Sequence, residues 1–138
     1  MKGKRIGRQT VQFSTPPVIR AAASVVGRKE GEGPLRDRFD SVSQDTYFGE
    51  KSWERAERRM QQMTLELALE KAGLTDADLD AAFAGDLLNQ CIGSSFSLRN
   101  RGVPTLGLYG ACSTMAESLL LAAMSVSGGY ARTALAMT

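Results

Sequence analysis

Tyr109-Gly110-Ala111-Cys112-Ser113-Thr114 separates two apolar stretches of the chain, Val103 to Leu108 before it and Met115 to Val126 after it. An apolar run, a glycine and then a long uncharged segment predict a strand, a tight turn and a buried helix. Cys112 therefore lies where the predicted helix begins. The first backbone N–H groups of a helix lack internal partners and carry the positive end of its dipole, so they favour a thiolate or a bound carboxylate.

These residues leave two uses of Cys112 open, because the helix start can activate a nucleophile or hold an anion. Taken alone, a cysteine is more often a buried structural residue. Cys91, which sits in an apolar helical stretch, is interpreted in that way. The 138-residue chain contains no histidine, so the usual general base of cysteine and serine nucleophiles is not among its residues.

The composition is that of a globular domain, with 43% hydrophobic and 23% charged residues. The two cysteines form no Cys-x-x-Cys pair, so neither a disulfide framework nor a metal site is expected. Neither a signal peptide nor an apolar stretch of the roughly 20 residues that span a bilayer is found, so we expect a cytoplasmic or peripherally membrane-associated protein. The weak net charge of +2 and a short basic start, interpreted as a solvated tail, indicate no nucleic-acid partner.

Residues 1–17 predict a basic, extended lead-in that ends at Pro16-Pro17, and residues 18–138 predict one incomplete α/β domain. The expected elements of that domain, in order, are a strand at Val18 to Gly27, a loop at Arg28 to Asp40, a long helix capped by Ser52 and stopped by Gly73, a turn from Thr75 to Asp80, a strand at Ala81 to Asp86, a weaker helix at Leu88 to Arg101, a strand at Val103 to Tyr109, a helix at Thr114 to Ser127 and a strand at Thr133 to Thr138. Strands that alternate with helices indicate a parallel sheet covered by helices. The last helix is apolar on nearly every face, which predicts burial on all sides and further covering layers that this chain does not itself supply.

Three polar residues, Asp86, Asn89 and Gln90, follow the second predicted strand of this sheet. Ligands of open α/β sheets bind at the carboxyl ends of the strands, so these side chains could line the same crevice as Cys112 and Ser113. Capping and loop hydrogen bonds account for the same residues almost as well. Glu117, one turn into the last helix, is interpreted as a helix-start charge or a satisfied buried carboxylate rather than a catalytic base.

The order of these features resembles the thiolase and ketoacyl-synthase superfamily, and within it a family of stage V sporulation proteins from spore-forming bacteria. The resemblance covers about residues 18–138. The motifs that carry it are Phe39-Asp40, Gln44-Asp45-Thr46, Phe48-Gly49-Glu50-Lys51-Ser52, Ala84-Gly85-Asp86-Leu87, Asn89-Gln90 and Gly107 to Thr114. The resemblance implies a thiolase-like αβαβα layered fold made of two similar halves, of which this chain is expected to supply most of the first.

The resemblance also implies a function. Similar proteins bind dipicolinic acid and support its uptake, with calcium, into the developing spore, beside other stage V sporulation A proteins at the membrane. A homodimer is expected by the same analogy. The ligand would lie near Cys112 and Ser113, with Asp86, Asn89 and Gln90 in the same crevice and no cofactor required.

The alternative is an acyltransferase or condensing enzyme. Cys112 matches the position of the nucleophile in thiolases, where it would accept an acyl group from acyl-CoA. The histidines and asparagine that assist this nucleophile would lie in the second half of the fold. The sequence alone leaves the choice between enzyme and binding protein open.

Overall fold

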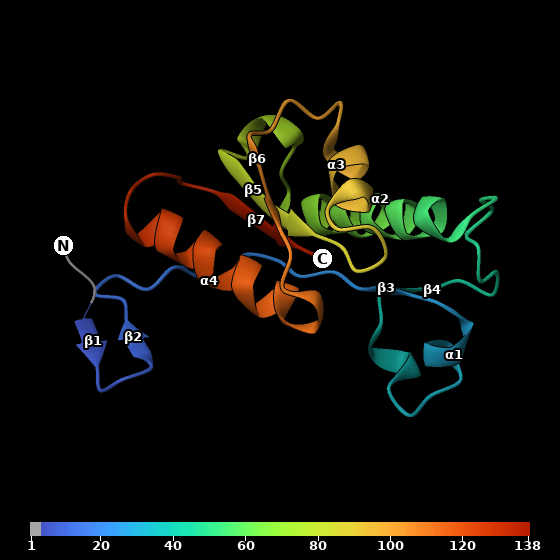
Figure 1. Cartoon of the computed structure of the whole chain (residues 1–138), viewed down its shortest axis with the longest axis horizontal. Helices are drawn as coiled ribbons and strands as arrows, with labels where there is room; N and C mark the ends of the chain where they lie inside the picture. Colours follow the sequence, from blue (N-terminus) through green and yellow to red (C-terminus); the bar gives the residue numbers. More distant parts are fainter. Residues whose placement is uncertain (1–3) are drawn as a thin grey trace.

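A computed structural model describes residues 4–138 and has a mixed α/β fold (Figure 1), as the sequence predicts. Its helices and strands are β1 (Lys4–Ile6), β2 (Thr10–Gln12), β3 (Val25–Val26), α1 (Arg28–Gly31), β4 (Ser41–Val42), α2 (Trp53–Ala72), β5 (Ala81–Gly85), α3 (Ile92–Leu98), β6 (Thr105–Leu108), α4 (Thr114–Ser127) and β7 (Ala134–Met137). Short 3₁₀ turns are η1 (Arg36–Arg38), η2 (Asp76–Asp78) and η3 (Ala111–Ser113). None of the helices in the described residues combines the length and the apolar character that a bilayer crossing requires.

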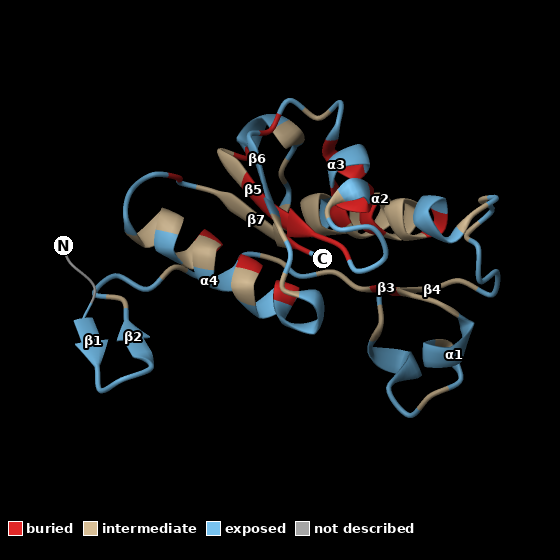
Figure 2. Ribbon diagram, viewed as in Figure 1, coloured by how far each residue is buried: buried red, intermediate tan, exposed pale blue. Residues whose placement is uncertain are grey.

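The centre of the fold is a three-stranded parallel sheet in the order β6-β5-β7. Successive side chains of a strand point to opposite faces of a sheet. On one face, Ala82 and Ala84 of β5 belong to a buried cluster with Leu65 of α2. On the other face, Gly85 lies against Thr114 at the start of α4. Helices therefore cover both faces of the sheet, and β5 at its centre contributes the most deeply buried segment (Figure 2).

The long helix α2 begins and ends where the sequence predicts. The Ser52 side chain accepts a hydrogen bond from the backbone N–H of Arg55, which caps the first turn. Gly73 has a φ of 64°, the left-handed conformation that ends many helices and that glycine adopts without strain. Thr75 and Asp78 then form a reciprocal capping box around η2, so the predicted turn before β5 is also confirmed.

The first predicted strand, Val18 to Gly27, is wrong over most of its length. Only Val25–Val26 form a strand, and they pair with Ser41–Val42 rather than with the central sheet. Val18 is 88% exposed, because this segment pairs with no strand of the central sheet. A largely apolar cavity of about 620 Å³ is enclosed by this segment, α2, α4 and β7. Of the lead-in predicted for residues 1–17, residues 1–3 lie outside the described residues, and residues 4–12 form an antiparallel hairpin of β1 and β2 rather than a single extended segment.

The helix α4 has the predicted bounds, and within the described residues only one face of it is buried. Its buried residues are Thr114, Ser118 and Ala122, which lie four residues apart on one face. Larger side chains of the helix are exposed, including Leu119 at 42% and Leu120 at 49%. Figure 2 shows buried positions on only part of α4. Small residues face the sheet because the helix packs closely against it, and the described residues place no second layer over its outer side.

Gly85, the last residue of β5, is where the sheet and α4 approach most closely. A Cβ atom at this position would overlap the carbonyl oxygen of Leu108 and the methyl group of Thr114. The missing side chain therefore lets the end of β5, the end of β6 and the first turn of α4 meet.

We expect Gly85→Ala to destabilise the protein by about 2–3 kcal/mol, because the added methyl group must displace a backbone carbonyl rather than a flexible side chain. Gly107→Ala on the neighbouring strand is the control, since its Cβ would lie 3.4 Å from the Cys91 sulfur, an ordinary contact. Urea unfolding of both full-length variants, followed by circular dichroism, measures the difference. Equal stability of the two variants would show that the close approach is not a constraint.

Candidate functional site

The candidate site lies at the carboxyl ends of β5 and β6, where the chain turns into α4. The parallel register pairs Gly85 with Leu108, so the segments that follow these residues leave the sheet at the same end. Cys112 lies in η3 and is exposed, with a free thiol. The prediction of a cysteine at the start of a helix is therefore confirmed.

Hydrogen bonds within the turn hold Cys112 in place. The Gly110 N–H donates to the Thr114 hydroxyl at 3.1 Å, and that hydroxyl donates to the Ala111 carbonyl at 2.8 Å. Ala111 has a φ of 49°, an uncommon conformation for a residue with a side chain. The turn directly before the cysteine is thus both strained and fixed by its neighbours.

The start of α4 is not capped by its own side chain. Ser113, at the N-cap position, makes no side-chain cap and instead donates its hydroxyl hydrogen to the Gly110 carbonyl at 2.7 Å. The backbone N–H groups of Ser113 and Thr114 donate to the Gly110 and Ala111 carbonyls, so an external acceptor would approach the N–H groups at the start of η3, those of Ala111 and Cys112. Beside a solvent-exposed cysteine, this arrangement suits either a bound carboxylate or a thiolate.

Glu117 adds a negative charge next to the helix start. A Cβ atom on Gly110 would lie 2.8 Å from the Glu117 Oε2 atom, so this carboxylate sits beside the turn that carries Cys112. Acidic residues in the first turn stabilise a helix through its dipole, which is one of the two roles predicted for Glu117. The Glu117 carboxylate also repels any anionic ligand that approaches the helix start.

Asp86 is brought to the end of the sheet but does not face an open crevice. Its side chain is buried, and its carboxylate accepts hydrogen bonds from the backbone N–H groups of Cys91 and Ser94 and from the Ser94 hydroxyl, at 2.8–3.1 Å. All three donors belong to the start of α3. The carboxylate therefore anchors this helix, which is the capping role that the sequence left open.

The other two predicted ligand residues lie in the loop between Asp86 and α3. Asn89 and Gln90 are both exposed, and Gln90 has a φ of 48°. The helical segment predicted from Leu88 begins only at Ile92, because Gln90 and Cys91 both adopt the left-handed conformation. Asn89 and Gln90 thus stay accessible at the same end of the sheet as Cys112.

Cys91 is a structural cysteine in this fold. Its sulfur donates to the Leu108 carbonyl at 3.1 Å and ties α3 to the end of β6. Burial, with a contribution from the Asp86 carboxylate, raises the pKa of the Cys91 thiol. The raised pKa keeps the proton on sulfur, which the hydrogen bond requires.

A buried polar layer between α2 and α3 was not anticipated from the sequence. The Gln61 amide donates to the Gly85 carbonyl at 2.8 Å and accepts from the Ser97 hydroxyl at 3.1 Å. One oxygen of Glu57 accepts from the N–H groups of Leu87 and Leu88. Glu57 and Gln61 are four residues apart on α2, and this polar step within an apolar helix face is the signal that could have revealed the layer.

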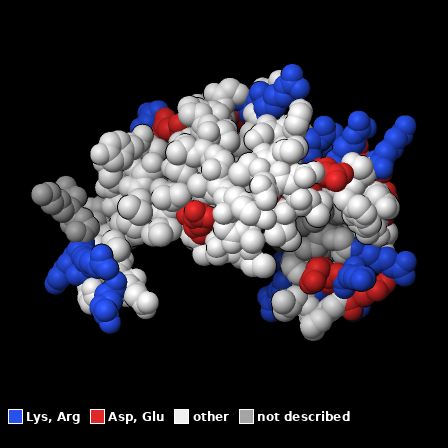
Figure 3. Space-filling model, in the orientation of Figure 1, with Lys and Arg blue, Asp and Glu red and all other residues white. Residues whose placement is uncertain are grey.

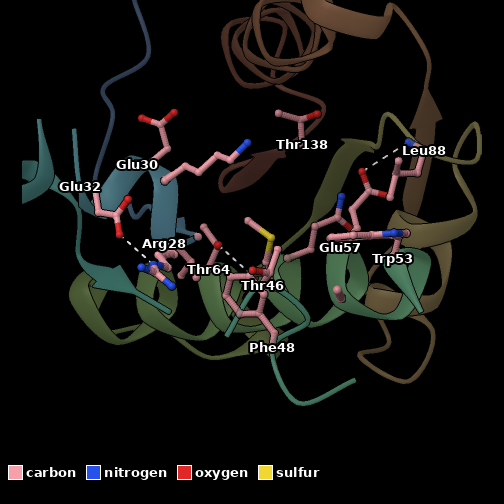
Figure 4. A pocket seen from close by; sticks show the side chains of 16 residues that line it. Arg28, Glu30, Glu32, Thr46, Phe48, Trp53, Glu57, Thr64, Leu88 and Thr138 are labelled. Carbon is pink, nitrogen blue, oxygen red and sulfur yellow. Dashed lines mark hydrogen bonds and ion pairs between the residues drawn. The ribbon is translucent and has the colours of Figure 1, made fainter. Parts of the chain in front are cut away.

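Glu57 also borders a cavity of about 700 Å³ between α1 and α2 (Figure 4). Figure 4 shows Glu57 and Trp53 at one end and the Arg28–Glu32 ion pair at the other, with Phe48 and Thr46 between them. None of the predicted site residues lines this cavity. In the part of the chain that the structure describes, no cluster of three or more acidic or cysteine side chains is arranged to hold a metal ion.

The comparisons with known proteins agree with one another. The family model of stage V sporulation protein AD matches residues 7–138. The stage V sporulation protein AD of Bacillus subtilis (strain 168) is 40% identical over 135 residues, which cover 98% of this chain and 40% of that relative. The chain therefore spans about two fifths of the length of the curated relative that it matches.

Glu57 gives the polar layer a dependence on pH that can be tested. Burial raises the pKa of Glu57 above its usual value of 4.5, against the hydrogen bonds from Leu87 and Leu88, and the Asp86 carboxylate raises it further. The folded protein then holds the proton more tightly than the unfolded chain does. Stability falls as the pH rises from 4.5 through the raised pKa, and Glu57→Gln removes this loss.

At neutral pH we expect Glu57→Gln to be more stable than the wild type by less than about 1 kcal/mol, because the side chain keeps some contact with water. Glu54→Gln is the control of opposite sign, since hydrogen bonds from its own backbone N–H and from Ser52 lower the pKa of Glu54. Urea unfolding between pH 4 and pH 8 measures both profiles. A Glu57→Gln profile as steep as that of the wild type would refute the assignment.

Proposed function

Because this chain belongs to the stage V sporulation protein AD family, we propose that it binds dipicolinic acid and supports the uptake of this ligand, with calcium, into the developing spore. We further propose that it works at the inner spore membrane as a peripheral protein, as a homodimer and beside the other stage V sporulation A proteins. No cofactor is required for this role. The ligand would bind at the start of α4.

The observation that carries this proposal is the uncapped start of α4 beside an exposed Cys112. Dipicolinic acid is a flat ring with two carboxylates at neutral pH. Backbone N–H groups at a helix start bind carboxylates without a general base, so the absence of histidine does not oppose binding. Asn89 and Gln90, exposed at the same end of the sheet, can donate hydrogen bonds to the second carboxylate.

The Glu117 carboxylate explains why calcium would assist binding at the start of α4. Its carboxylate lies beside the helix start, so a free dianion would meet a like charge there. A calcium ion chelated by the ligand cancels this repulsion and can take a further oxygen from Glu117, since calcium prefers oxygen ligands. The position of Glu117 therefore favours the calcium complex over the free acid as the ligand.

Calorimetric titration of the full-length protein with dipicolinate tests the proposal. We expect saturable heat, with a higher affinity when calcium is present, and a Cys112→Ser variant that binds a few-fold more weakly because it loses contact with the thiol. No heat at millimolar ligand, with or without calcium, would refute the proposal.

The same titration of a Glu117→Gln variant tests whether the ligand binds at the start of α4. Removing the like charge should strengthen binding of calcium-free dipicolinate by roughly fivefold, which corresponds to about 1 kcal/mol for a partly exposed charge pair. It should also reduce the benefit of calcium. Glu70→Gln, on the exposed side of α2, is the matched control and should leave both affinities unchanged. An equal response of the two variants would place the ligand elsewhere.

A second function is favoured by one observation, the strained turn before an exposed thiol. Ala111 has a φ of 49°, and a nucleophile on a sharp strand-to-helix turn beside backbone N–H groups is suited to acyl transfer. In this alternative the Cys112 sulfur attacks the thioester carbonyl of acyl-CoA. The acyl group moves to Cys112, and coenzyme A leaves as the thiol.

Intact-protein mass spectrometry after incubation with acetyl-CoA distinguishes the two functions. The enzyme function predicts a mass increase of one acetyl group that Cys112→Ala abolishes and Cys91→Ala retains. For the binding protein that we propose, we expect no adduct on Cys112. An adduct that forms and turns over would replace the binding proposal.

A further inference from the structure

The N-terminal hairpin is the most strongly basic part of the molecule. Residues 1–12 contain four Lys and Arg and no Asp or Glu. Residues 13–138 carry the other 13 of the 17 cations against all 15 acids, so that part has a net charge of −2 and the first 12 residues have +4. The overall charge of +2 conceals this separation.

The hairpin projects from the body of the protein (Figure 1). β1 and β2 pair through Lys4 with Gln12, Arg5 with Val11 and Ile6 with Thr10, and all six residues are exposed. Figure 3 shows the Lys and Arg side chains of the hairpin gathered at one end of the molecule. A two-stranded hairpin that packs chiefly on itself is only marginally stable in water. A partner that packed against this hairpin would therefore stabilise it.

Apolar side chains accompany the charges on both faces of the hairpin. Cross-strand partners share a face, so Arg5 and Val11 lie on one side and Lys4 and Ile6 on the other. Ile6 is 46% and Val11 52% exposed. Cations next to exposed aliphatic side chains suit the interface of an anionic bilayer, where headgroups attract the charge and the acyl boundary accepts the aliphatic groups. Nucleic-acid phosphates attract the cations but offer no apolar surface for the aliphatic side chains.

We infer that the β1–β2 hairpin is a docking element for an anionic lipid surface. Lys4, Arg5 and Arg8 meet the headgroups, and Ile6 and Val11 enter the interface. The remainder of the molecule has a net charge of −2 and gains nothing from the same surface, so the attraction of the hairpin orients the protein with the hairpin toward the lipid. This deepens the proposed location at the membrane but does not depend on ligand binding by α4.

Vesicle co-sedimentation of the full-length protein tests the inference. The vesicles contain phosphatidylcholine alone or phosphatidylcholine mixed with an equal amount of phosphatidylglycerol. We expect binding to the mixed vesicles only, and weaker binding as salt is raised from about 0.05 M to about 0.5 M. Each cation near an anionic surface is worth about fivefold in partitioning, so Lys4→Glu/Arg5→Glu/Arg8→Glu should lose at least about 100-fold.

A variant with the same change of charge elsewhere separates docking from general electrostatics. Arg38→Glu/Lys51→Glu/Arg55→Glu reverses three exposed cations outside the hairpin and should lose less than about tenfold. An equal loss in both triple variants, or equal binding to neutral vesicles, would overturn the inference. Circular dichroism and the dipicolinate titration, both unchanged in the hairpin variant, show that folding and ligand binding are intact.

The aliphatic residues separate a lipid partner from a nucleic acid. Ile6→Ser/Val11→Ser should weaken binding to the mixed vesicles several-fold. Binding of a random-sequence duplex DNA at the same salt is measured in parallel. Tighter binding to the duplex than to the vesicles, abolished by the charge reversals and unaffected by the two serines, would overturn the lipid assignment in favour of a nucleic acid.

Discussion

The absence of a side chain at Gly85 is the constraint on which the candidate site depends. The ends of β5 and β6 and the first turn of α4 come together at this residue, within the space that a methyl group would fill. The close approach also explains why α4 turns Thr114, Ser118 and Ala122 toward the sheet, although its sequence offers many leucines. Small side chains allow α4 to lie close to the sheet. This close packing brings the start of α4 to the ends of β5 and β6. The geometry of the turn that carries Cys112 is thus a consequence of how closely α4 packs on the sheet.

Elements with strong local signals could be predicted from the sequence, and elements that depend on distant partners could not. The cap at Ser52 and the stop at Gly73 define α2 through bonds within a few residues, and both were predicted. The segment from Val18 to Ser24 has the composition of a strand, but a strand also requires a neighbour to pair with, and the described residues provide none. The hairpin of β1 and β2 was missed because its sequence is polar and lacks alternating apolar residues.

The same distinction applies to the candidate site. The position of Cys112 followed from the strand and helix on either side of it, and the structure confirms it. The role of Asp86 could not be chosen from the sequence, because a carboxylate after a strand can bind a ligand or a helix start equally well. Its three hydrogen bonds to α3 favour the second role. The layer formed by Glu57, Gln61 and Ser97 joins segments up to 36 residues apart, so no local pattern could have paired these side chains.

The aromatic pair at the start of α2 has a spectroscopic consequence. Trp53, the single tryptophan in this sequence, is half exposed, and its ring is stacked on that of Tyr47 with 4.3 Å between the ring centres. Tryptophan emission from this protein therefore reports on the corner beside the 700 Å³ cavity, which the residues of the α4 start do not line. A molecule that enters the cavity changes the polarity around the indole directly, whereas one held at Cys112 alters the emission only if the core between the two places moves.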